Sequence, residues 1–268
     1  MNQQSSTILN NTLRSLRGLA ATALLTLHVD IRCGVIYTIS RVMAGGPPTP
    51  PKDGTPTTSL QGANISWPLI LPSQPTAAAP TILDLNNDLM VFDTNITTYL
   101  KPSERHFITS GLERFVDQVF VSCTRYIGAM NNNGALRLKL DALVLQQNLK
   151  NIILHSGKVT KADQEDSSQL VSLPRSAKFL DWFIEGPQKA LEYAKEEKEA
   201  FMTDRKKALA AGKGEPFSYD ELRVLIELCF SEVMRGPRGQ QNREDFMAAK
   251  RSNSDAMFRL SEIMWDAK

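Results

Sequence analysis

The feature that most constrains the fold is a long run of apolar and small residues at alternating steps of three and four. The run occupies positions 9, 13, 16, 20, 23, 27, 31, 35, 38 and 42. Because an α-helix has about 3.6 residues per turn, this spacing places the run on one stripe of a single helix. At about 1.5 Å per residue the helix would be roughly 50 Å long, which exceeds the width of a small globular domain. Gly45, Gly46 and the prolines that follow them end it.

The same helical spacing recurs along the rest of the chain. Apolar stripes lie between residues 85 and 99, 112 and 130, and 136 and 153, and again in several stretches after Pro174. Asp84 is expected to cap the first of these helices, and Ser218 with Glu221 has the spacing of a capping box. Pro174 suits the first turn of a helix, and Pro187 is expected to kink or restart that helix. No segment alternates apolar and polar residues as a half-buried strand does. The sequence therefore predicts an all-α fold.

Two polar stretches divide the chain. Residues 44–80 hold most of the prolines and cannot form a packed element, so we expect a flexible loop rather than a polyproline ligand. Residues 156–172 are polar and are expected to form a linker. Residues 1–43 and 81–155 would then form a first helical bundle, with 1–43 as its long amphipathic helix. Residues 173–268 would form a C-terminal helical bundle.

Residues that could catalyse a reaction or bind a metal are few and scattered. The 268 residues carry a net charge of +2 with three Cys and three His, which is atypical of a nucleic-acid binder, a disulfide framework or a zinc-finger array. His28 and Arg32 share a helix face, but a metal site there would need ligands from elsewhere. We predict no catalytic, cofactor-binding or metal-binding residues, no cofactor, and no nucleic-acid or small-molecule partner.

The cysteines and the N-terminal apolar stretch bear on the cellular compartment. Cys33, Cys123 and Cys229 each lie among apolar residues at helical spacing, which favours buried free thiols in a reducing cytosol. The apolar stretch 19–27 is too short to cross a bilayer, which needs roughly 20 apolar residues. We expect that stretch to be part of the long helix.

Three stretches of the chain resemble, in order and spacing, one protein family. Residues 143–152 read LVLQQNLKNI and are similar to a signature near the C-terminus of the Sec-eight subunit of the exocyst. The signature positions are Leu143, Leu145, Gln146, Gln147, Asn148, Leu149, Asn151 and Ile152. Residues 85–89 and 27–33 are similar to two helix motifs of the same family. The resemblance covers about residues 20–155.

The resemblance implies elongated stacked helical bundles, of the type shared by multisubunit tethering complexes, and no enzymatic activity. It implies a C-terminal fragment of a non-catalytic exocyst subunit, which tethers secretory vesicles to the plasma membrane before fusion. The partners would be other exocyst subunits, with vesicle and plasma membrane reached indirectly. The location would be cytoplasmic, peripheral at sites of polarised secretion. Trp67, Trp182 and Trp265 are candidate anchors for partners, although burial within a bundle is favoured for each.

Two alternatives from other classes stay open at this point. Asp84, Asp88 and the scattered histidines would suit a small helical enzyme with a buried carboxylate or phosphate site. The charged run from Lys189 to Lys213 would suit a peripheral membrane-binding helical bundle, although its interspersed acids weaken that interpretation.

Overall fold

The computed structural model describes residues 2–45, 68–155, 172–203, 205, 215–235 and 242–265, and most of them are helical. The first group of helices is α1 (Asn2–Met43), α2 (Pro80–Tyr99), α3 (Pro102–Thr109), α4 (Leu112–Cys123) and α5 (Asn132–His155). The second group is α7 (Pro174–Glu185), α8 (Pro187–Thr203), α10 (Tyr219–Arg235) and α12 (Arg243–Trp265). The predicted all-α fold is confirmed.

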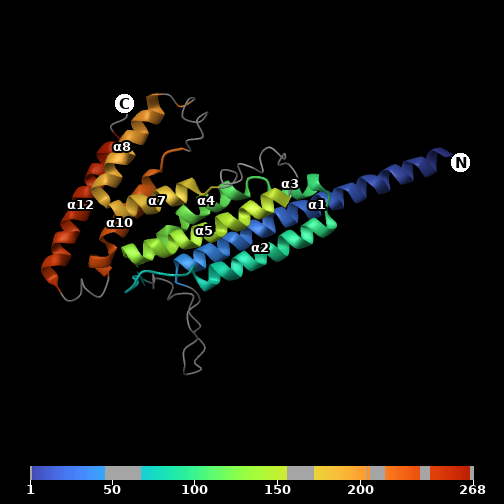
Figure 1. The fold of residues 1–268 in the computed structure, drawn as a ribbon. Coiled ribbons are helices and arrows are strands. Elements are labelled where there is room, and N and C mark those ends of the chain that lie inside the picture. Colours follow the sequence, from blue (N-terminus) through green and yellow to red (C-terminus); the bar gives the residue numbers. More distant parts are fainter. Residues whose placement is uncertain are drawn as a thin grey trace, which may run out of the picture.

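The first group forms an elongated bundle, and the second group lies at one end of it (Figure 1). Within the bundle, α1 packs against α2, α3 and α4, and α5 packs against α2. Helix α7 connects the two groups because it contacts α4 and α5 on one side and α8 and α10 on the other. At the far end of the bundle α1 continues past its neighbours toward the N-terminus (Figure 1). Residues 46–67 of the loop expected at 44–80, and residues 156–171 of the linker expected at 156–172, lie outside the described residues, so the domain boundaries stay predictions.

One short sheet interrupts the helical architecture. Strand β1 (Pro68–Leu69) pairs in parallel with β2 (Ala129–Met130), although no strand was expected from the sequence. The helix expected to reach residue 130 ends at Cys123 and is followed by a 3-10 turn, Thr124–Tyr126. A Cβ on Gly134, in the first turn of α5, would lie 2.1 Å from the carbonyl oxygen of Leu69. Glycine at this position therefore allows β1 to lie directly over α5.

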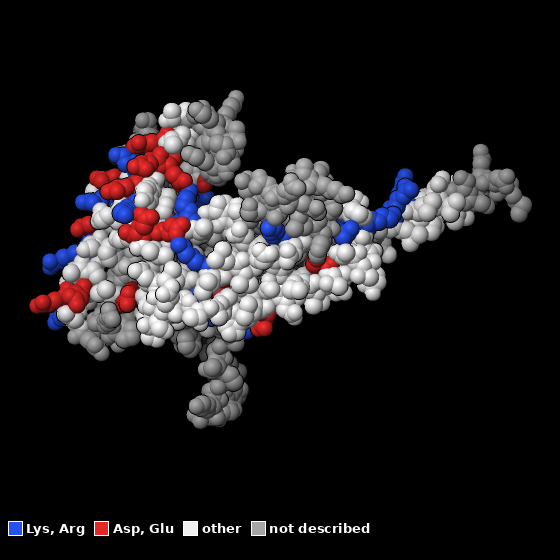
Figure 2. Space-filling view, viewed as in Figure 1, with Lys and Arg blue, Asp and Glu red and all other residues white. Residues whose placement is uncertain are grey.

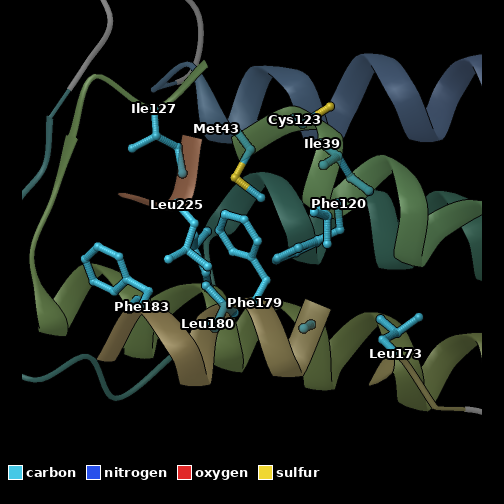
Figure 3. Close-up of a cluster of buried hydrophobic side chains, with 14 of the residues drawn as sticks. Ile39, Met43, Phe120, Cys123, Ile127, Leu173, Phe179, Leu180, Phe183 and Leu225 are labelled. Atoms are coloured by element: carbon cyan, nitrogen blue, oxygen red, sulfur yellow. The ribbon is translucent and has the colours of Figure 1, made fainter. Parts of the chain in front are cut away.

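A single hydrophobic core runs through both groups of helices. It includes Ile39 of α1, Phe120 of α4, Phe179 of α7 and Leu225 of α10, and Figure 3 shows these side chains converging. The part of α1 inside the bundle buries Ile31, Val35, Ile39 and Met43, at steps of four residues. The expected stripe passed through positions 38 and 42 instead, and both are half-buried. Each step of four residues turns the buried face by about 40° around the helix axis, so the face follows the neighbouring helices rather than a straight stripe.

Two buried aspartates cap helices that begin with proline. Asp141 of α5 accepts a hydrogen bond from the backbone N–H of Ala79, the residue before α2, at 2.6 Å. Asp117 of α4 accepts hydrogen bonds from the backbone N–H groups of Arg175 and Ser176 in the first turn of α7, at 3.0 and 2.7 Å. A carboxylate at a helix N-terminus satisfies free N–H groups and complements the helix dipole. The prediction that Asp84 caps this helix is wrong, because α2 begins four residues earlier and Asp84 is exposed within it.

The predicted breaks between the later helices are confirmed. Pro174 opens α7, and Pro187 opens α8 directly after Gly186, whose φ of 96° an L-residue would rarely adopt. The capping box is also present: the backbone N–H of Ser218 donates to Glu221 Oε2 at 2.7 Å, and the N–H of Glu221 donates to Ser218 Oγ at 3.3 Å.

Candidate interaction surfaces

The signature segment lies in the middle of α5 and divides into a buried and an exposed half. Leu145, Leu149 and Ile152 are almost fully buried, and Asn148 is 4% exposed. On the other side Leu143 is 59% exposed, and Gln147 and Asn151 are exposed as well, with Gln146 half-buried. The buried half is a packing element of the bundle. Only the exposed half is available to a partner.

Asn148 explains why an amide occupies the buried half of the signature. Its Nδ2 donates to the backbone carbonyl oxygen of Asn86 and to Asn86 Oδ1, each at 2.6 Å. Asn86 belongs to α2, in the second stretch that carried the family resemblance. Two motifs that lie 62 residues apart in sequence are therefore joined by one buried polar contact.

A polar cluster joins α4, α7 and α10, and we name it the Arg175 cluster. Arg175 Nη2 lies 2.6 Å from Glu221 Oε2, its Nη1 donates to the Glu215 carbonyl oxygen at 2.6 Å, and its guanidinium stacks 4.6 Å from the centre of the Phe217 ring. Gln118 Nε2 of α4 donates to Glu221 Oε1 at 3.3 Å. Burial alone would raise the pKa of Glu221, but hydrogen bonds from Ser218 and Arg175 outweigh it, so the pKa is lowered. The cluster holds an ion pair at the junction between the two groups of helices.

At Asp141, by contrast, the effect of burial on the pKa outweighs the effects of hydrogen bonding and neighbouring charge. Burial raises its pKa to about 6, and the hydrogen bond from Ala79 and the charge of Arg137 offset only part of that rise. Arg137 Nε is 3.9 Å from Asp141 Oδ1, and Asp141 Oδ2 has no hydrogen-bond partner in the described part of the chain. Its position at the N-terminus of α2 assigns it a structural role.

The residues considered for an enzyme site are dispersed by the fold. Asp84 and Asp88 are exposed on α2, whereas His28 Nδ1 lies 3.1 Å from the carbonyl oxygen of Phe107 in α3. Arg32, on the same face of α1, donates to the carbonyl oxygens of Ile108 and Ser110 at 3.1 and 2.7 Å. Together they hold the C-terminal end of α3, where free carbonyl groups favour donors. Within the described ranges, no three His, Cys, Asp or Glu residues are grouped as a metal site would require.

The three cysteines differ in exposure. Cys123 is buried and Cys229 is half-buried, and burial raises the pKa of Cys123 and raises that of Cys229 to about 12. Thiols with raised pKa values are poor nucleophiles at neutral pH. The prediction that Cys33 is buried is wrong, because it lies on the outward face of α1.

The lysines of α8 are engaged with nearby acceptors. Lys189 lies 3.5 Å from Glu185, Lys195 lies 3.9 Å from Glu199, and Lys178 of α7 pairs with Glu197. Lys198 Nζ donates to the last carbonyl groups of α12, those of Ile263 and Met264, at 2.6 and 2.8 Å. The described part of this charged run is therefore a network within the protein, which weakens the membrane-binding alternative. Residues 206–213 of the run lie outside the described residues.

Of the three tryptophans, one is a core residue and one is a surface residue. Trp182 is 6% exposed and makes an edge-on contact with Phe217, with ring centroids 5.2 Å apart. Burial was also favoured for Trp265, and that expectation is wrong, because the side chain is 78% exposed at the end of α12. Trp67 lies outside the described residues.

Most of the exposed large apolar side chains of the described residues lie on the first group of helices, above all on α1. Every described side chain from residue 7 to 23 is exposed, including Ile8, Leu9, Leu13, Leu16 and Leu19. We call residues 7–23 the overhang. The helical segment Thr7–Met43 is long and apolar enough to cross a membrane, by length and composition alone. From the sequence, the apolar stretch 19–27 alone was considered, and it is too short to do so. Only 11% of the most apolar window of Thr7–Met43 is buried, and the buried residues of this segment, Ile31, Val35, Ile39 and Met43, lie in the part that packs in the bundle.

The described residues thus define a helical bundle whose candidate interaction features are helix faces. The chain matches no family model. It is 29% identical, over 93% of its length, to a Neurospora crassa protein described as a probable exocyst complex component sec8. A second match, 32% identical over 27% of the chain, is exocyst complex component 4 of Dictyostelium discoideum. The resemblance to the exocyst Sec8 family indicated by the three motifs is confirmed. The chain spans about a fifth of the length of the Neurospora protein, at 21%, and 6% of the Dictyostelium protein is matched.

Proposed function

We propose that the chain is part of a non-catalytic exocyst subunit and corresponds to the C-terminal region of that subunit. In this role it contributes to tethering secretory vesicles at the plasma membrane before fusion. The observation that carries the proposal is the match to the Neurospora protein over 93% of the chain. The all-helical architecture supports it, because long packed helices suit a scaffold that acts through protein contacts.

The proposed partners are other exocyst subunits, and vesicle and plasma membrane are reached through the complex. The proposed location is the cytoplasm, peripheral at sites of polarised secretion. The dispersal of Asp84, Asp88 and His28 gives no support to the enzyme alternative.

The experiment is affinity purification of the full-length protein that carries this region, expressed at its natural level with a tag. We expect the other exocyst subunits to be recovered in near-equal amounts. Recovery of none of them, with the tagged protein intact and folded, would contradict the proposal. A tagged unrelated cytosolic protein of similar abundance is the control for non-specific recovery.

A further inference from the structure

We draw no further inference here: the strongest candidate, the exposed apolar face of the overhang at the N-terminal end of α1, carries nothing further because nothing in the structure shows what covers it.

Discussion

The two groups of helices share one core but differ in the surfaces they present. Of the 20 large apolar side chains that are exposed among the described residues, 16 belong to α1–α5 and the intervening turn, and four belong to α8 and α12. Helix α8 carries seven charged residues among its 17, whereas α2 carries three among its 20. Figure 2 shows the charged side chains gathered over the end formed by α8, α10 and α12. The second group therefore presents a mainly charged surface, whereas the first presents most of the exposed apolar side chains, as the proposed contacts with other proteins would require.

The largest expected effect tests whether the core is shared despite these different surfaces. Phe179→Ala removes a side chain that is 1% exposed and should lower the free energy of unfolding by about 4 kcal/mol. Hydrogen exchange should report the same loss in α5 and in α10. The control is Phe258→Ala, which removes a 66% exposed ring and should change stability by less than about 0.5 kcal/mol. A loss confined to α7–α12 would show that the two groups unfold independently.

The next effect concerns the junction between the groups. Asp117→Ala leaves the backbone N–H groups of Arg175 and Ser176 without their acceptor, and we expect a loss of about 3 kcal/mol in urea unfolding. Asp117→Asn keeps one acceptor oxygen and should lose about 1 kcal/mol. Equal losses for the two substitutions would indicate that the carboxylate does not cap α7.

A smaller effect tests the cap inside the first group. Because the pKa of Asp141 is raised from its usual 3.8 to about 6, the folded state binds this proton more tightly than the unfolded state. This contribution to stability is fully present below about pH 4 and is lost as the pH rises through 6. Between pH 7 and pH 5 the wild-type protein should gain about 1 kcal/mol relative to Asp141→Asn. Asp84→Asn, an exposed change in α2, is the control and should show no such difference. Parallel pH profiles for wild type and Asp141→Asn would contradict the assignment.

The smallest effect belongs to the charged surface of the second group. Lys195 and Glu199 are 3.9 Å apart and both about two-thirds exposed. Such pairs contribute little, so Lys195→Ala should change the free energy of unfolding by less than about 0.5 kcal/mol in thermal or urea unfolding. A loss above about 1 kcal/mol would mean that this surface stabilises the fold rather than keeping it soluble.

Local patterns predicted the helices well, and long-range contacts account for most errors. The capping box at Ser218 and the helix starts at Pro174 and Pro187 depend on residues within one turn, and all three are present. The true cap of α2 comes from Asp141, 62 residues away from Ala79, and no local signal identifies it. Asp84 was chosen instead because it was a suitable residue beside the expected helix start.

Exposure was predicted less well than helicity. The expected stripe on α1 has the same spacing on the overhang as inside the bundle. Periodicity therefore identified the helix, but not the residue at which the neighbouring helices stop packing against it. Cys33 was expected to be buried for the same reason, whereas burial of Trp265 was favoured because tryptophans are mostly buried. The signature segment was recognised from its amino-acid sequence. Which of its residues are buried, such as Leu145, and which are exposed, such as Leu143, became known only from the packing of α5 in the structure.

Hydrogen exchange of the assembled complex tests the central claim most directly. The full-length protein is measured alone and within the purified exocyst, and amide protection is compared for the overhang and for α8. If the first group provides the contact surface, protection of residues 7–23 should rise at least tenfold in the complex while α8 stays unchanged. Protection that rises in α8 and α12 but not in the overhang would contradict the assignment of the two surfaces.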